Sequence, residues 1–274
     1  MVRAARGRAA PLSPERAGIP STTRRLIRCA ENPLPLRRDC AVVGVDGCKD
    51  GWLYAVGGAS GGVLAEVGIA PSFAALVRAV PDAALLAIDV PIGLPDAGPR
   101  ACDVEARAFL GRPRGSSVFP APIRAVLPAA TYAEACARHE AVDGRRLTLQ
   151  AFHLLSRIRE VDAFLRSDRL RADRTFEVHP EVAFAHLLGA PVVAPKRTAE
   201  GRGVRRAALE RIFPGGFEHA RQDLRGAGRY AADDLLDALV VLWSAGRLRA
   251  GTAATFPAAG GARDVMGLRM EIAA

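Results

Sequence analysis

The stretch AVVGVDGCKD, residues 41–50, decides the fold because it places one acid at the end of a strongly apolar run. Its three valines are β-branched and favour a pleated surface, so the run predicts a buried strand. A carboxylate inside such a strand costs several kcal/mol unless it is paired or bound to a cation, and Asp46 therefore needs a partner. Gly47 lets the chain turn, and residues 51–56 predict a second strand that returns antiparallel.

A second acid, Asp89, ends another apolar run, ALLAIDVP at residues 84–91. Between the two acids, residues 62–70 predict a third strand, and Ser72 can cap a helix that precedes the fourth strand. A helical crossover places the fourth strand parallel to the first. Asp46 and Asp89 are then expected at one rim of the sheet, where ligands of open α/β sheets bind.

Two more acids lie on a long apolar helix predicted for residues 230–243. Asp233 and Asp234 suit the first turn of this helix, whose N-terminus favours negative charge. Asp237 lies three residues after Asp234 on the same face, where the two carboxylates repel each other unless a cation lies between them. Together with the two strand acids, they form a set of hard oxygen ligands that suits Mg²⁺ or Mn²⁺.

The remaining periodic segments complete an α/β domain over residues 39–274. Helices are predicted for residues 100–110, 132–139, 149–166 and 182–188, a fifth strand for residues 175–178, and an edge strand for residues 264–272. The expected fold is a mixed five-stranded sheet flanked by helices, with a mostly helical insertion at residues 93–174 after strand four.

Two polar segments are candidates for binding a phosphate-bearing substrate. The Gly/Pro/Ser loop at residues 111–124 carries Arg114, Ser116, Ser117 and Arg124, and arginines beside hydroxyls suit phosphate oxygens. The alternative is a solvated loop held by prolines. A second cationic run contains Lys196, Arg197, Arg202, Arg205 and Arg206. It suits a nucleic-acid backbone, or it is the solvated face of a helix.

The net charge of +9 belongs mainly to the first part of the 274-residue chain. Residues 1–38 hold nine arginines against two glutamates, which accounts for +7, and they lack a helical or strand period. We expect a disordered tail that either binds a polyanion or is a dispensable extension. No apolar run approaches membrane-spanning length, and the five cysteines form no CxxC pair, so a cytoplasmic protein without a membrane segment is expected.

Six separated motifs resemble one known family. They are GVDGCKDGW at 44–52, IDVPIGL at 88–94, RACDVEAR at 100–107, SSVFPAPIR at 116–124, EVHPEVAF at 177–184 and DDLLDAL at 233–239. Together they are similar to the bacterial and archaeal family called domain of unknown function 429, a predicted nuclease family of the ribonuclease H-like superfamily. The closing Asp-x-x-Asp-Ala-Leu also resembles the helix of Holliday-junction resolvases. The first 38 residues lie outside the resemblance.

The resemblance implies a metal-dependent nuclease. In it, Asp46 and Asp89 are shared ligands of Mg²⁺ or Mn²⁺, Asp237 closes the metal site, and Asp234 assists. Glu177 or Glu181 could add a ligand, and His179 could transfer protons near neutral pH. Each of these side chains also has a structural interpretation, as a hydrogen-bonding group at a strand end or turn.

Two other classes of function stay open. The turn at residues 46–51 could fold around ATP phosphates, as in sugar kinases, although IDVPIG lacks the glycine and hydroxyl pattern of their second phosphate loop. The chain could also be a catalytically silent module that binds nucleic acid or protein. No stripe of aromatic residues suggests a platform for single strands. The choice between RNA, DNA and a small phosphoester, and the oligomeric state, are left open.

Overall fold

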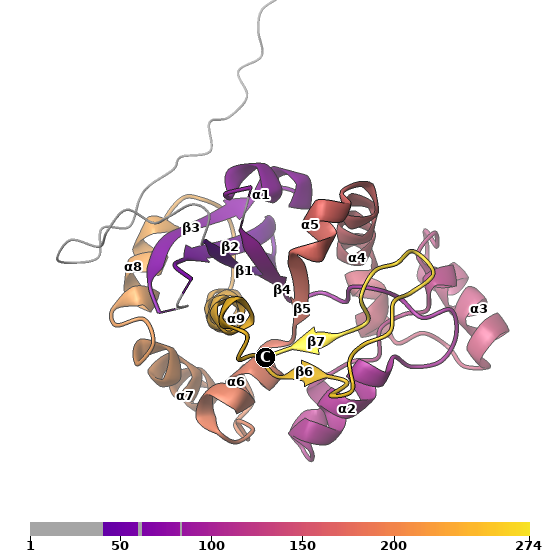
Figure 1. Ribbon diagram of the computed structural model, residues 1–274. Coiled ribbons are helices and arrows are strands. Elements are labelled where there is room, and N and C mark those ends of the chain that lie inside the picture. Colours follow the sequence, from indigo (N-terminus) through magenta and orange to yellow (C-terminus); the bar gives the residue numbers. More distant parts are fainter. Residues whose placement is uncertain (1–40, 60–61, 83) are drawn as a thin grey trace, which may run out of the picture.

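A mixed β-sheet organises the described part of the chain. The computed structural model describes residues 41–59, 62–82 and 84–274, so the tail predicted for residues 1–38 lies outside it. In these residues, seven strands form one sheet in the order β3-β2-β1-β4-β5-β7-β6 (Figure 1). The strands are β1 (Val42–Cys48), β2 (Gly51–Gly57), β3 (Leu64–Ala70), β4 (Leu85–Ile88), β5 (Thr175–Val178), β6 (Thr255–Phe256) and β7 (Ile272–Ala273).

The pairing of the first four strands confirms the expected hairpins and crossover. β1 pairs antiparallel with β2, and β2 pairs antiparallel with β3. β4 lies parallel to β1, with Val45 opposite Ile88. β5 then adds parallel to β4, so the C-terminal ends of β1, β4 and β5 meet at one rim of the sheet.

The end of the chain differs from the sequence prediction. The sheet has seven strands instead of five, because the two-residue strands β6 and β7 extend it beyond β5. The predicted edge strand at residues 264–272 is wrong, since its last residue alone enters β7, which lies between β5 and β6. Before it, the Asp264 carboxylate accepts hydrogen bonds from the amides of Met266 and Leu268, and Gly267 has a positive φ of 76°. These contacts fold a turn where the alternation predicted a strand.

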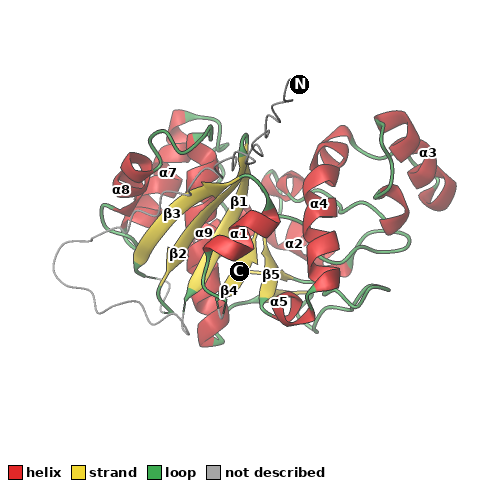
Figure 2. Ribbon diagram, turned by 90° about the horizontal axis from the view of Figure 1, so that it is seen from above, coloured by secondary structure: helices red, strands yellow, loops and turns green. Residues whose placement is uncertain are grey.

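Helices cover both faces of the sheet (Figure 1). The helices are α1 (Phe73–Ala79), α2 (Ala101–Leu110), α3 (Tyr132–Asp143), α4 (Leu149–Ser167), α5 (Arg169–Asp173), α6 (Pro180–Leu188), α7 (Ala199–Glu210), α8 (Gly216–Asp223) and α9 (Ala232–Ala250). α1 and α4 pack on one face, and α9 packs on the other with α6, α7 and α8 beside it. The segment at residues 93–174 contains α2 to α5, of which α3 lies farthest from the sheet (Figure 2).

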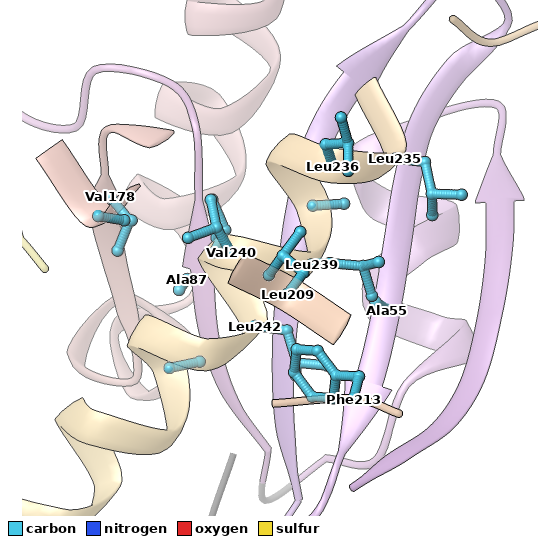
Figure 3. Packing of buried hydrophobic residues seen from close by; sticks show 14 of the residues in the cluster. Ala55, Ala87, Val178, Leu209, Phe213, Leu235, Leu236, Leu239, Val240 and Leu242 are labelled. Carbon is cyan, nitrogen blue, oxygen red and sulfur yellow. The ribbon is translucent and has the colours of Figure 1, made fainter. Parts of the chain in front are cut away.

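The core beneath α9 fixes the position of that helix. Leu239, Val240 and Leu242 pack against Ala55 and Ala87 of the sheet (Figure 3). All five residues are buried. Burial of a leucine or valine side chain stabilises the fold by roughly 1.5–3 kcal/mol. The helix extends past the predicted end at residue 243 to Ala250, because Ala245 and Leu248 continue the contact with the same core.

Gly44 allows α9 to cross β1 at unusually short range. A Cβ atom at this position would lie 2.2 Å from the amide nitrogen of Leu242 and 2.3 Å from the carbonyl oxygen of Ala238. No side chain fits there, so the glycine of the opening motif lets the helix backbone rest directly on the strand. The N-terminal end of α9 is thereby held near the rim where β1 and β4 end.

The structure bears on two features read from composition, the lack of a membrane-spanning run and the cysteines. Within the described residues, no helix combines the length and apolarity needed to cross a membrane. Cys48, Cys102 and Cys136 are buried free thiols in this part of the chain. The cytoplasmic location stays a prediction.

Candidate active site

Two acids are neighbours at the rim of the sheet. The amide of Asp89 donates a hydrogen bond of 3.0 Å to the carbonyl of Val45, which continues the parallel pairing of β1 with β4. Even-numbered residues of β1 pack under α9, so the side chain of Asp46 belongs to the helix-covered face. Asp46 is 8% exposed, and both acids line the same cleft.

α9 brings two further acids to this rim. Asp237 is 2% exposed, and its negative charge raises the pKa of Asp46, as does that of Asp234. Asp234 has a second task, because its Oδ2 accepts a hydrogen bond of 2.8 Å from the amide of Ala231 at the start of the helix. The acids of the strands and of the last long helix are thus on one side of the sheet.

Burial and mutual repulsion make these carboxylates reluctant to ionise. Burial raises the pKa of Asp46 well above its ordinary value, and the charges of Asp89 and Asp237 raise it further. Burial also raises the pKa of Asp89 and of Asp237 to about 6 each, against the opposing effect of Lys196. The rim therefore concentrates negative charge for which the nearby protein cations compensate in part.

Lys196 is the cation that lies nearest to these acids. Its Nζ donates a hydrogen bond of 2.7 Å to Oδ2 of Asp237. Burial lowers the pKa of this lysine, but the carboxylates of Asp237, Asp89 and Asp46 outweigh that effect and raise it. The second oxygen of Asp237, Oδ1, is buried and has no hydrogen-bond partner. One buried acceptor thus stays unsatisfied beside the other two acids.

The donor chemistry of the rim fits a hard divalent cation. Carboxylate oxygens are the ligands that Mg²⁺ and Mn²⁺ prefer, and an ion would both satisfy Oδ1 of Asp237 and reduce the repulsion on Asp46. As arranged here, no three His, Cys, Asp or Glu side chains among the described residues already form a ligand cage. Lys196 occupies only the other oxygen of Asp237, Oδ2.

Asp46 and Asp89 line a cleft of about 750 Å³. Its walls carry most of the predicted substrate-binding residues, together with several aromatic and cationic side chains. Those from the loop after α2 are Arg114, Ser116, Ser117 and Phe119, those from α4 are His153 and Arg157, and those before α7 are Lys196 and Arg197. Arg197 is exposed, and the hydroxyl of Ser116 donates to the carbonyl of Pro113 at 3.0 Å.

Arg114 is held at the cleft by a buried ion-pair network. Its Nη2 lies 2.8 Å from Oε2 of Glu181, and Arg205 binds the same carboxylate at 2.6 Å. Arg205 is fully buried. It therefore neither contacts nucleic acid nor lies on a solvated helix face, the two interpretations given for the cationic run at residues 196–206. The two guanidinium groups occupy the Glu181 carboxylate and lower its pKa despite burial. Glu181 therefore positions Arg114.

Glu177 is a structural counter-ion in spite of its place in the cleft wall. Oε1 and Oε2 accept hydrogen bonds of 2.7 Å from the guanidinium of Arg100, and the amide of Ile92 adds another of 2.7 Å. Asp103 binds the same guanidinium at 2.6 Å. The prediction that Glu177 adds a metal ligand is not supported, because its oxygens are already used by this buried network.

Arg124 does not have the substrate-binding role predicted for it. It was expected to bind substrate, but it does not line the cleft and instead bridges two acids. Its Nη2 lies 2.9 Å from Asp162 and also binds Asp264, the residue that shapes the turn before β7. Arg124 therefore joins α4 to the C-terminal segment.

His179 lines the cleft directly after β5. Its Nε2 donates to the carbonyl of Ser117 at 3.2 Å, which leaves Nδ1 buried without a hydrogen-bond partner. Burial lowers the pKa of this histidine. The imidazole is thus neutral near pH 7, with the lone pair of Nδ1 free to accept a proton.

Sequence reasoning missed Arg157, which shares a helix face with His153. Its Nη2 donates to the carbonyl of Cys48 at 2.6 Å, and its guanidinium lies 5.4 Å from the centre of the Trp52 ring. A Cβ on Gly47 would lie 1.2 Å from Nη1 of Arg157, so the arginine rests on this glycine beside Asp46. The spacing of four residues between His153 and Arg157 was the available signal.

Comparison with known proteins gives one result. A family model described as protein of unknown function (DUF429) matches residues 44–260. No curated protein and no solved structure matches the chain. The matched segment covers more than half of the chain and includes Asp46, Asp89, Lys196 and Asp237. On this match, the chain belongs to the DUF429 family.

Proposed function

We propose that this protein is a metal-dependent phosphodiesterase with a ribonuclease H-like core that hydrolyses nucleic acid. The observation that carries the proposal is the convergence of Asp46, Asp89 and Asp237 at one rim of the sheet, beside the cleft that Asp46 and Asp89 line, where each pKa is raised by burial and by neighbouring negative charge. A buried acid cluster of this kind is costly unless a cation is bound. The ribonuclease H-like assignment rests on the order of these acids along the chain, on the first strand, the fourth strand and the last long helix.

The proposed roles follow from the placement of each side chain. Asp46, Asp89 and Asp237 would hold Mg²⁺ or Mn²⁺, and Asp234 would add negative charge from the first turn of α9. When bound, such an ion polarises a phosphoryl oxygen and lowers the pKa of a bound water. Lys196 would then be free to bind a phosphate oxygen.

The cations on the walls of the cleft would hold the substrate phosphates. Arg114, positioned by Glu181, and Arg157, positioned over Gly47, present guanidinium groups from different elements. Arg197 is exposed at the same cleft and could bind a neighbouring phosphate. His179 can accept a proton at Nδ1, because its other nitrogen is already committed to Ser117.

The alternative of a sugar-kinase-like phosphotransferase has less support. That function would need exposed amides in the turn at residues 46–51. The amide of Gly47 instead donates to Oδ1 of Asp46 at 2.7 Å, and Arg157 covers this glycine. The carboxylate of Asp50 binds Arg229 at 2.7 Å on the outside of the turn. The contacts within this turn therefore favour a closed hairpin over a phosphate cradle.

A nuclease assay tests the proposal. Purified protein is incubated with Mn²⁺ and labelled single strands, duplexes, RNA/DNA hybrids and junctions. We expect cleavage of at least one substrate by the wild type, and loss of cleavage in Asp46→Asn, Asp89→Asn and Asp237→Asn. Asp96→Asn is the control, because Asp96 is exposed and does not line the cleft. Equal cleavage by Asp237→Asn, or cleavage of none of the substrates, would refute the proposal, and a melting-temperature shift with ATP alone would favour the kinase.

A further inference from the structure

The acids at and behind the cleft are recessed, and the cleft itself is of limited size. Asp46 and Asp237 are 8% and 2% exposed, and the cleft volume of about 750 Å³ is that of a small-molecule site. A single strand fits such a space, whereas a double helix can present to it only the phosphates of its outer surface. Enzymes that act on a base inside a pocket take a single strand or extrude the nucleotide, and a recessed site favours an unpaired strand in the same way.

One wall of the cleft carries a partly exposed aromatic residue. Phe119 is 40% exposed and lines the same cleft as Arg114 and Lys196. The backbone on either side of it is fixed, because the Val118 carbonyl accepts a hydrogen bond from Nη1 of Arg107 and the Ala121 amide donates to Asp103 at 2.9 Å. Val118 itself is 1% exposed. The backbone that carries Phe119 is thus held in place, and the residue stays partly exposed at the cleft.

A second ring faces the same cleft from another element. His153 is exposed on α4, four residues before Arg157, and both side chains line the cleft. Aromatic rings beside cations are the usual surface for an unpaired nucleotide, since the base stacks on the ring and the cation binds the phosphate. Arg114 and Lys196 complete this arrangement with positive charge near the acids. The sequence showed a single phenylalanine here, so no aromatic stripe could reveal it.

We propose that the cleft takes single-stranded nucleic acid and that one unpaired base packs against Phe119, with His153 as a second contact. This inference rests on the proposed function for the identity of the reaction, although the binding site itself is independent of hydrolysis. The base-binding part of the cleft would then discriminate between paired and unpaired substrate. The acids would act on the phosphate adjacent to the stacked base.

The test compares matched substrates and matched phenylalanine variants. The substrates are a labelled single-stranded oligonucleotide, the same strand annealed to its complement, and the base-free ester methyl p-nitrophenyl phosphate, all with Mn²⁺. We expect the wild type to cleave the single strand faster than the duplex. In Phe119→Ala, the KM for the single strand should rise about 5- to 100-fold. Phe119→Trp should restore the KM, while hydrolysis of the base-free ester should be the same in all variants.

Phe109→Ala is the control variant. Phe109 has the same exposed fraction of 40% but stacks on His186 at 4.7 Å, away from the cleft. Equal cleavage of duplex and single strand would overturn the inference, as would an unchanged KM in Phe119→Ala or an equal loss with the base-free ester.

Binding of the labelled single strand to Asp237→Asn, measured by fluorescence anisotropy, separates this inference from the proposed function. Weaker binding after the additional change Phe119→Ala supports the subsite even if no ester is hydrolysed, and unchanged binding refutes it.

Discussion

Asp237→Asn tests the electrostatic argument for the site without any assumption about the substrate. Burial and the charge of Asp89 raise the pKa of Asp237 to about 6, from an ordinary value of 3.8, although Lys196 opposes the shift. One pH unit corresponds to about 1.4 kcal/mol, so ionised Asp237 lowers the free energy of unfolding by roughly 3 kcal/mol in the metal-free protein. Asparagine has nearly the same shape and cannot ionise. We expect the variant to be more stable than the wild type at pH 7.5.

The sign of the pH dependence follows from the same numbers. Between about pH 4 and pH 6, folded Asp237 keeps a proton that the unfolded chain has released, so its contribution to stability falls as the pH rises and is constant above that range. His179 and His186 act in the opposite direction, because burial lowers the pKa of each and their contribution is lost as the pH falls. The difference between wild type and variant removes these other groups from the comparison.

Urea unfolding at pH 4.5 and pH 7.5, with a chelator present, measures this difference. We expect a gain of up to about 3 kcal/mol for Asp237→Asn at pH 7.5 and a much smaller one at pH 4.5. Asp96→Asn, at an exposed acid, should show no such pH dependence. Added Mn²⁺ should then stabilise the wild type but not Asp237→Asn. If the wild type is the more stable protein at pH 7.5 without metal, the pair with Lys196 outweighs burial and the reasoning is refuted.

Three further predictions concern the contacts that support the site. Gly44→Ala should lower the free energy of unfolding by about 2 kcal/mol or more, because the new Cβ meets the backbone of α9 at 2.2 Å; a loss below about 0.5 kcal/mol in urea unfolding would contradict this. Glu177→Gln should cost about 3–5 kcal/mol in the same assay, since it leaves Arg100 buried without its main counter-ion. Gly47→Ala should cost less than about 1 kcal/mol, because it meets the flexible end of Arg157, yet phosphodiester hydrolysis should fall at least about tenfold. Unchanged hydrolysis would mean that Arg157 does not bind the phosphate.

Local signals were sufficient to predict the arrangement of the acids. Apolar runs that end in Asp46 and Asp89 predicted buried strands. The helical crossover between these strands predicted their parallel pairing, which the register confirms. The helix of Asp237 was equally clear from its apolar length. These elements are long and periodic, and their contacts with one another follow from general rules of chain topology.

The partners of charged side chains could not be predicted in the same way. Glu177 lies 77 residues from Arg100, and Arg124 lies 140 residues from Asp264. Sequence spacing carries no information on such distant pairs. Glu177 and Arg124 were therefore assigned to the site, although each forms an ion pair inside the fold. The strands β6 and β7 were missed for a related reason, because two residues are too few for a period.

The acids and their internal cation differ in how firmly the fold holds them. Asp46 is on a central strand, and Asp237 is on a helix whose backbone rests on Gly44, so neither can move without disturbing the core. Lys196 comes from a segment between α6 and α7, its side chain is 39% exposed, and a flexible stem carries its ammonium group. The proposed divalent ion could therefore displace Lys196 by a side-chain rotation while the carboxylates stay in place. In the proposed metal-bound state, the sheet and α9 would therefore supply the fixed ligands, and Lys196 would be the charge that moves.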